Sequence, residues 1–370
     1  MLFREALEDG AMESFFPLIE QFHTQADPAF CGLASLVMAL NALGVDPGRI
    51  WRGPWRWFSE ELLDCCTPLD QVRKAGVSLE EVACLARCNG ADGQLFRADT
   101  QGLDAFRSAV QLASRSTDRV LIASYARGGL GQTGAGHFSP LGGYHAGRDL
   151  ALVLDVARFK YPPHWVPLST LFEATRDIDP ESQRPRGWLL LSKRSAPSAV
   201  THFLICKDGI GIKDVVQDLV ASLAERLREQ AVATLSQLLH ASAAALERSG
   251  LSARVQFRAP QTPEHAVLLA ALEAAISTLG LYRCAVEALG NERALSVVLW
   301  LLAAPQTLWS ALPPPLGREL MDLLDTDAMP AELAGEVSLL RSQVEFLLEH
   351  AGRSAIGAPG LRITTAPGGA

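Results

Sequence analysis

A change of sequence pattern near residues 193–198 constrains the fold of this chain more than any other feature. Before it, short runs rich in β-branched and aromatic residues alternate with patterns of helical spacing; after it, the patterns are long, helical and rich in Ala, Leu, Glu and Arg. The segment itself has the composition of a linker. A chain of 370 residues also exceeds the size at which one hydrophobic core keeps growing. We therefore predict an α+β domain over residues 1–198, an all-α domain over 199–351 and a flexible tail over 352–370.

The second half predicts a series of helices, and residues 313–315, three prolines, are expected to interrupt it once. The pattern leaves two roles open for this half, a packing domain or the surface of a homodimer. The expected helices span Val215–Arg228, Val232–Ser249, Pro263–Leu279, Ala285–Ala303 and Ala331–Glu349.

Charge and hydropathy exclude several classes of partner. The formal net charge of −8 argues against nucleic acid. The most apolar run, Ala294–Pro305, is about a dozen residues long, below the ~20 residues of a membrane-spanning helix, so we expect no membrane partner. The first residues are too acidic for a signal peptide. We therefore expect a cytoplasmic protein whose seven cysteines are free thiols and not a disulfide framework.

Cys31 stands at the start of an apolar helix. Leu33, Leu36, Val37 and Leu40 recur at helical spacing and predict a helix over residues 32–43. A helix N-terminus offers unpaired N–H groups and a positive dipole end, which favour a thiolate over a thiol. The amide of Gln25, six residues upstream, is placed to complete an oxyanion hole with the Cys31 N–H. The alternative is a buried cysteine in a core helix.

A predicted hairpin supplies the partners that a cysteine nucleophile needs. Residues 136–145 and 150–157 have the pattern of two antiparallel strands joined by a turn near residues 146–148. Folding the chain back there brings Asp155 within one or two positions of His137 on the facing strand. We expect His137 to take the thiol proton and return it to a leaving amine, while Asp155 orients the imidazole. A structural histidine and a surface aspartate are the alternative.

Several long stretches together resemble a known family. They include residues 25–43, WRGPWRWF at 51–58, LDCC at 63–66, the hairpin around His137 and DVARFKYPPHWVPL at 155–168. Over roughly residues 1–195 the chain resembles phytochelatin synthase, the glutathione γ-glutamylcysteinyltransferase family of the papain-like superfamily. The resemblance implies a papain-like catalytic domain in which a nucleophile helix packs on an antiparallel sheet.

The resemblance also implies an activity on glutathione. Cys31 would attack the carbonyl between cysteine and glycine, expel glycine and hold γ-glutamylcysteine as a thioester. A second glutathione or a phytochelatin peptide, presented as a cadmium or zinc thiolate, would accept the acyl group, with no permanently bound cofactor. Two alternatives stay open: a glutathione hydrolase that gives γ-glutamylcysteine and glycine, and a non-catalytic protein that sequesters heavy-metal ions as thiolates.

The resemblance also assigns residues that contact the substrate. Asp179 and Arg186 occupy the positions that the family uses for the zwitterionic γ-glutamyl group, and an arginine fork suits a carboxylate. An exposed ion pair is the alternative, worth at most about 1 kcal/mol. The basic and aromatic side chains beside the triad strands are further candidates for the anionic acceptor: Arg127, Arg158, Lys160 and Tyr161.

Four cysteines match the family's pattern outside the nucleophile. Cys65 and Cys66 are adjacent, and Cys84 and Cys88 fall at i, i+4 on a helix expected over residues 79–89. Both pairs are candidates for a soft metal. No paired CxxC motif with zinc-site spacing is present, so a packing role is the alternative.

Overall fold

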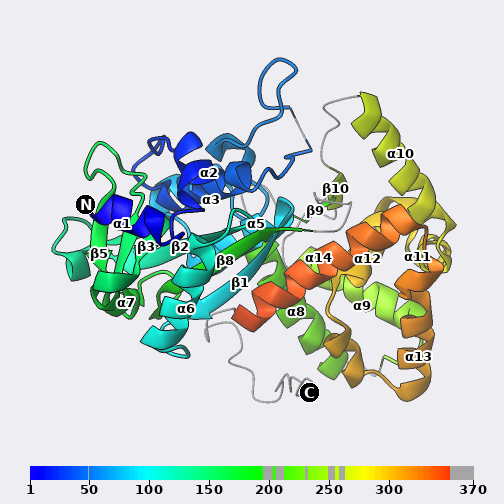
Figure 1. Cartoon of the computed structure of the whole chain (residues 1–370). Coiled ribbons are helices and arrows are strands. Elements are labelled where there is room, and N and C mark those ends of the chain that lie inside the picture. Colours follow the sequence, from blue (N-terminus) through cyan, green and yellow to red (C-terminus); the bar gives the residue numbers. More distant parts are fainter. Residues whose placement is uncertain are drawn as a thin grey trace. The chain divides into compact units, whose positions relative to one another are not determined.

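The computed structural model describes residues 1–48, 50–194, 203–205, 212–229, 232–248, 255–257 and 263–350. Contact clustering divides the chain into two compact units, Met1–Thr201 and His202–Ala370, and each is described here by itself (Figure 1). The predicted tail over residues 352–370 and most of the predicted linker lie outside the described residues.

The first unit is built on one antiparallel sheet of six strands. The strands follow the order β1-β8-β2-β3-β4-β5, and each pairs with its neighbours in antiparallel register. A separate pair of two-residue strands, β6 and β7, precedes β8. The strands are β1 Ala91–Arg97, β2 Arg119–Ala126, β3 Gly136–His145, β4 Leu150–Val153, β5 His164–Pro167, β6 Ile178–Asp179, β7 Arg184–Pro185 and β8 Gly187–Lys193.

Helices cover both faces of this sheet. In Figure 1, α3 and α5 lie above the strands, and α6 and α7 lie below them. This arrangement confirms the mixed α+β prediction for the first half of the chain. The helices are α1 Leu2–Glu8, α2 Phe15–Glu20, α3 Cys31–Ala42, α4 Leu69–Ala75, α5 Leu79–Cys88, α6 Leu103–Ser114 and α7 Leu168–Thr175.

Large aromatic side chains fill the core on the α6 and α7 side. Phe106, Val110 and Ala113 recur along α6 at helical spacing and are buried against the sheet. Phe106 packs on Trp188 of β8 with a ring centroid distance of 4.8 Å, and Phe172 of α7 completes the cluster. Burial of each aromatic side chain stabilises the fold by about 1.5–3 kcal/mol.

The predicted hairpin is confirmed, with one irregularity. A single 3₁₀ turn, Ala146–Arg148, joins β3 to β4, and Asp149 after it adopts φ 50°, which aspartate tolerates better than most residues. The register shifts between Leu141 and Gly143, so one extra residue bulges from β3. Asp155 therefore follows the end of β4 and does not lie within a strand.

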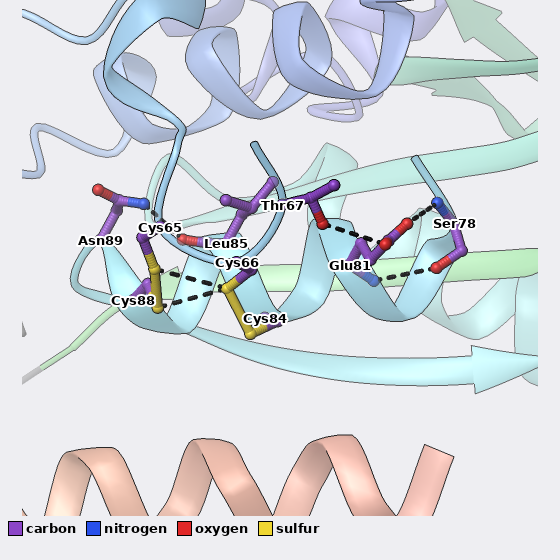
Figure 2. The surroundings of a disulfide bond; sticks show 9 residues. All are labelled: Cys65, Cys66, Thr67, Ser78, Glu81, Cys84, Leu85, Cys88 and Asn89. Atoms are coloured by element: carbon purple, nitrogen blue, oxygen red, sulfur yellow. Dashed lines mark hydrogen bonds between the residues drawn. A yellow bond between two sulfur atoms is a disulfide. The ribbon is translucent and has the colours of Figure 1, made fainter. Parts of the chain in front are cut away.

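The prediction of free thiols is wrong for four cysteines. Cys65 is joined to Cys88, and Cys66 is joined to Cys84 (Figure 2). The predicted helix is confirmed, and its two cysteines, one turn apart, face the same irregular segment. The sequence could not reveal this pairing, because only the tertiary fold brings residues 65 and 66 against α5.

The second unit is mostly helical, but the all-α prediction is wrong in detail, since two short strands pair within it. The helix expected over 285–303 is divided at Gly290, whose φ of +79° favours glycine. The three prolines begin a helix, because proline fits the first turn. The elements are β9 Phe203–Ile205, α8 Ile212–Glu229, α9 Leu235–Arg248, β10 Val255–Phe257, α10 Pro263–Thr278, α11 Gly280–Leu289, α12 Asn291–Ala303, α13 Pro314–Leu323 and α14 Ala331–His350.

One helix forms the centre of the second unit. Nearly all of the second half of α12 is buried, including Trp300, and α9, α11 and α14 pack around it. Among the described residues, no single helix is both long and apolar enough to cross a membrane; α10 and α11 meet those criteria only as a pair bent by 74°.

Candidate active site

The start of α3 places Cys31 next to the sheet. Asp27 accepts a hydrogen bond from the Ala29 N–H at 3.0 Å, which shapes the turn that leads into the helix. Gly32 follows, and a Cβ there would overlap the side chain of Val77 and lie 3.1 Å from Val82 Cγ2. Only glycine allows the first turn of α3 to pack this closely on Val82 of α5 and on Val77, which precedes α5, so Cys31 stands at the start of a tightly packed helix.

His137 and Asp155 form a buried hydrogen-bonded pair. His137 Nε2 lies 2.8 Å from Asp155 Oδ1, and both side chains are almost fully buried. The imidazole also hydrogen-bonds to the Cys31 thiol. The fold therefore brings the three residues of the predicted triad together, with the imidazole between sulfur and carboxylate.

The electrostatics of the triad favour a charged pair of cysteine and histidine. Burial opposes ionisation of the Cys31 thiol, but its hydrogen bond to His137 and backbone hydrogen bonds from Phe138 and Gly32 outweigh burial and lower its pKa. Burial also opposes protonation of His137, yet its contacts with Asp155 and Cys31 raise its pKa. A thiolate beside an imidazolium is the form that attacks a carbonyl.

Arg127 holds the triad carboxylate from its other side. Its Nη1 and Nη2 atoms donate to the two oxygens of Asp155 at 2.9 and 3.1 Å. Burial raises the pKa of the Asp155 carboxyl, but His137 and Arg127 outweigh it and keep that pKa well below its usual range. Removing one partner of such a buried pair costs about 3–5 kcal/mol. The predicted acceptor contact of Arg127 stays a prediction, since the residue is only 3% exposed and its guanidinium is bonded to Asp155.

Sequence reasoning missed the residues that continue this hydrogen-bond chain. Gln132 Oε1 accepts from Arg127 Nη1 at 2.6 Å, and Gln132 Nε2 donates to His164 Nε2 at 3.0 Å. His164 Nδ1 in turn donates to the Pro162 carbonyl at 2.8 Å, so the chain of hydrogen bonds runs from Asp155 to the segment that leads into β5. No spacing in the sequence indicates these contacts, because they depend on how the loop between β2 and β3 closes.

Gln25 lies beside the triad but its amide is engaged elsewhere. The Gln25 N–H donates to the Val156 carbonyl at 3.0 Å, which ties this segment to the residue after Asp155. Its side-chain Nε2 donates to the carbonyls of Asp27 and Pro28 at 2.8 and 2.9 Å. An oxyanion function requires the amide to exchange at least one of these bonds for the substrate oxygen, so this role stays a prediction.

Arg186 and Asp179 form an ion pair beside Gly136, the residue before His137. Arg186 Nη2 lies 3.1 Å from Asp179 Oδ1, with both side chains largely buried. The guanidinium packs on Gly136, where a Cβ would overlap it. The pair is therefore not the exposed surface pair that was the alternative to a substrate site.

Two further arginines, which sequence reasoning missed, surround this pair. Arg97 bonds to Glu80 and to the Pro185 carbonyl, and Arg184 lies 3.8 Å from Glu80. Burial, followed by the nearby charge of Arg184, lowers the pKa of Arg97 to about 10. These arginines and Arg186 thus share one charged cluster with the carboxylates of Glu80, Asp179 and Asp99.

The remaining predicted acceptor residues lie on the exposed segment after Asp155. Lys160 Nζ donates to the Thr133 carbonyl at 2.6 Å, and the Tyr161 hydroxyl accepts from the Thr133 N–H at 2.8 Å. The Arg127 guanidinium lies 4.9 Å above the Tyr161 ring. Arg158 lies farther along, stacked 4.7 Å from the Phe22 ring. Lys160 and Tyr161 therefore lie beside Arg127, which holds the triad carboxylate. Arg158 instead contacts the segment before Gln25.

Comparison with known proteins gives one consistent family. Residues 1–188 match the family described as phytochelatin synthase. Glutathione gamma-glutamylcysteinyltransferase 1 of Lotus japonicus is 53% identical over 206 residues, which are 56% of this chain and 41% of that protein. Its Arabidopsis thaliana namesake is 52% identical over 208 residues, 56% of this chain and 43% of that protein. The Schizosaccharomyces pombe glutathione gamma-glutamylcysteinyltransferase is 46% identical over 199 residues, 54% of this chain and 48% of that protein.

The matched region spans less than half the length of these three relatives. Residues 1–188, which match the family, contain all the residues of the site described above. Because the family match covers more than half of the chain, the chain belongs to the phytochelatin synthase family.

Proposed function

We propose that this chain is a glutathione γ-glutamylcysteinyltransferase that makes phytochelatin peptides by a cysteine-nucleophile mechanism on a papain-like fold. The observation that carries the proposal is the hydrogen-bonded series Cys31, His137, Asp155 on a chain of this family. The relatives bear the name of this transferase. An antiparallel sheet with the nucleophile at the start of a packed helix supports the papain-like architecture.

The first half of the reaction is acyl transfer to the enzyme. The Cys31 thiolate attacks the carbonyl between the cysteine and glycine of glutathione, and the negative charge moves to the carbonyl oxygen. His137 then gives its proton to the departing glycine amine, and γ-glutamylcysteine stays on Cys31 as a thioester. Asp155 keeps the imidazole oriented and stabilises its charged form, while Arg127 keeps Asp155 ionised and fixed.

The second half transfers the acyl group to an acceptor. The amine of a second glutathione, with its thiol held as a cadmium or zinc thiolate, loses a proton to His137 and attacks the thioester. The metal ion belongs to the substrate in this scheme. Lys160 and Tyr161, beside the Arg127 support, are placed to meet an anionic acceptor.

The γ-glutamyl end of the donor has a carboxylate and an ammonium on one carbon. Arg186 and Asp179 present the complementary charges 3.1 Å apart. The Arg186 guanidinium packs on Gly136, the residue before the catalytic histidine. A bidentate arginine contact fits the carboxylate, and Asp179 fits the ammonium. This is the charge pattern that distinguishes a free γ-glutamyl end from an ordinary peptide.

Product analysis tests the proposal. The protein should release glycine from glutathione, and Cys31→Ser should abolish this release, while Cys284→Ser in the second unit should leave it unchanged. Glycine release by Cys31→Ser at the rate of the parent chain would refute the assignment of the nucleophile. Tight metal binding without any glycine release would instead support the sequestering protein.

A second measurement separates transfer from hydrolysis. With cadmium or zinc added, mass spectrometry should detect peptides extended by γ-Glu-Cys units. If γ-glutamylcysteine is the sole product at every glutathione and metal concentration, the transferase proposal fails and the hydrolase replaces it.

A further inference from the structure

The ion pair proposed to bind the γ-glutamyl end is held by two separate supports. Asp179 Oδ1 faces Arg186, and Asp179 Oδ2 accepts from the Ser182 N–H and hydroxyl at 3.2 and 3.0 Å. The Arg186 N–H donates to the Asp177 carbonyl, and the Arg186 carbonyl accepts from the Ala98 N–H, both at 3.1 Å. The carboxylate is therefore fixed by the turn that follows it, whereas the guanidinium depends on the backbone that leads into β8.

Arg97 holds the residue next to Arg186. It is the last residue of β1, and it pairs with Gly187, the first residue of β8. Arg97 Nη1 donates to the Pro185 carbonyl. A Cβ on Gly187 would overlap the Phe96 carbonyl, so the two strands meet here backbone against backbone. One side chain thus fixes the short segment from which the Arg186 guanidinium projects.

Glu80 of α5 anchors Arg97 in turn. It accepts from Arg97 Nη2, and both side chains are almost fully buried. The same carboxylate oxygen lies 3.8 Å from Arg184 Nη1. Glu80 therefore meets both the arginine bonded to the Pro185 carbonyl and the arginine that precedes Pro185.

Arg97 is a charged group in this cluster. Burial and the charge of Arg184 lower the pKa of Arg97 to about 10, while Asp179 and Asp99 act in the opposite direction. A pKa at that value leaves the side chain positively charged at neutral pH. Glu80 gives this buried cation a directly bonded carboxylate, so Asp179 stays paired with Arg186.

Arg186 keeps one donor for a ligand. In the part of the chain that the structure describes, its Nε is buried and has no hydrogen-bond partner. A buried N–H without an acceptor is unfavourable, and two N–H groups of one guanidinium can meet a carboxylate together. The α-carboxylate of a γ-glutamyl group supplies the missing acceptor, provided that the guanidinium keeps its place.

We propose that Arg97 and Glu80 are positioning residues that set the affinity and selectivity of this site for the α-carboxylate of a γ-glutamyl group. Arg97 fixes the Pro185 carbonyl and with it the start of β8, and Glu80 fixes Arg97 against α5. Neither residue contacts the substrate, because that contact belongs to Arg186. The inference rests on the proposed function, which names the γ-glutamyl ligand.

A second ion pair joins the same two strands at their other end and provides a matched control. Asp92 lies in β1, and Arg194 directly follows β8. Arg194 Nε lies 3.0 Å from Asp92 Oδ1. Loss of this pair removes a link between β1 and β8 without touching the segment around Arg186. It therefore separates a general weakening of the sheet from a loss of positioning.

The test compares two ligands that differ in one group. γ-Aminobutyryl-cysteinylglycine is glutathione without its α-carboxylate, and calorimetric titration of the Cys31→Ala chain, which forms no thioester, gives a Kd for each. Arg97→Gln/Glu80→Gln in this chain removes both charges of the pair and leaves no buried ion unpaired. It should raise the Kd for glutathione about tenfold, as expected for the loss of one charged hydrogen bond, and leave the Kd for the analogue within about twofold.

The control and the contrary outcomes are as sharp. Arg194→Gln/Asp92→Asn should change neither Kd. An equal change for both ligands in the Arg97→Gln/Glu80→Gln chain would show a merely structural role and overturn the proposal, and so would an unchanged Kd for glutathione. Failure of the Cys31→Ala chain to bind glutathione at all would also overturn it.

A conservative variant decides the case in which the double variant does not fold. Arg97→Lys keeps a cation beside Glu80, but one ammonium nitrogen does not replace two guanidinium nitrogens that bond to separate partners. The Kd for glutathione should rise by a smaller factor and the Kd for the analogue should stay unchanged; an unchanged ratio of the two would refute the positioning role.

Kinetics of the chain that retains Cys31 give an independent measurement. Arg97→Gln/Glu80→Gln should raise the KM for glutathione and leave kcat nearly unchanged, since the triad is intact. If the parent chain binds glutathione but releases no glycine, the proposed function fails, and the ratio of the two Kd values still decides this inference.

Discussion

Asp155 is the most constrained residue of the site. One oxygen accepts from His137 Nε2 and from the Ala157 N–H at 2.9 Å, and Arg127 spans both oxygens. Each of these hydrogen bonds favours the charged form, so together they outweigh burial and hold the pKa of the Asp155 carboxyl well below its usual range. This anion, together with the Cys31 thiol, raises the pKa of His137 despite burial.

The pH profile of glycine release should depend on this carboxylate. The pKa of Cys31 is lowered and that of His137 is raised, so the charged pair exists at pH values between these two pKa values. The pH dependence of activity should therefore be bell-shaped. Asp155→Asn should reduce kcat by about 10³–10⁴-fold and move the alkaline limb to lower pH, because His137 loses the group that raises its pKa. Asp149→Asn, in the hairpin turn, is the control. An unchanged alkaline limb in Asp155→Asn would contradict the assigned role.

Gly136 makes a second prediction at the scale of single residues. Its Cα faces the Arg186 guanidinium, so Gly136→Ala should displace that side chain and raise the KM for glutathione about tenfold, the loss of one charged hydrogen bond. Gly128→Ala is the matched control, since a Cβ at Gly128 meets nothing within 4 Å. Steady-state kinetics compare the two variants. If both give the same KM, Arg186 does not bind the substrate.

At the scale of elements, the packing of α3 on α5 fixes where the nucleophile lies. Local patterns were sufficient to predict both helices and the β3–β4 hairpin, because apolar spacing and turn residues act over a few positions. The disulfides, the support of Asp155 by Arg127 and the Gln132–His164 contact could not be predicted. Each of these contacts joins residues that only the tertiary fold brings together. A basic residue near the end of a strand, such as Arg127, also looks the same in the sequence whether it is exposed or buried.

The close packing of Gly32 in α3 on Val77, just before α5, can be tested with one substitution that overfills the space and a second that removes the overlap. Gly32→Ala should lower the free energy of unfolding of the first unit by about 1–3 kcal/mol, because the added methyl overlaps Val77. Val77→Ala in the same chain removes the overlapping group, so the double variant should recover part of this loss. Denaturant unfolding of the two single variants and the double variant measures the coupling. Strict additivity would mean that the two side chains do not meet.

At the scale of the whole molecule, the two units have separate cores. Trp188 is buried at the centre of the first and Trp300 at the centre of the second, and all the site residues described above belong to the first. Sequence composition favours a two-domain organisation because the change from mixed to helical patterns extends over more than a hundred residues on each side. Composition could not predict the β9–β10 pair, whose strands have three residues each.

Separate cores predict separate unfolding. Calorimetry should resolve two unfolding transitions. Trp188→Ala should lower the midpoint temperature of only one of them, because it reduces the free energy of unfolding of the first unit by about 3–5 kcal/mol. Trp300→Ala should lower the midpoint of the other. Loss of glycine release on heating should follow the transition that Trp188→Ala shifts. A single transition that both substitutions shift equally would show one cooperative molecule.

The bulge in β3 has a consequence for comparing distant relatives of this chain. A relative lacking one residue at Gly142 would pair the neighbours of that position with successive residues of β4, so it would keep the hairpin but lose the bend and extra twist that the bulge gives to β3. The strand that contains His137 would then approach Asp155 at another angle. A relative with a gap at this position should therefore have lower activity, even where every other motif is retained.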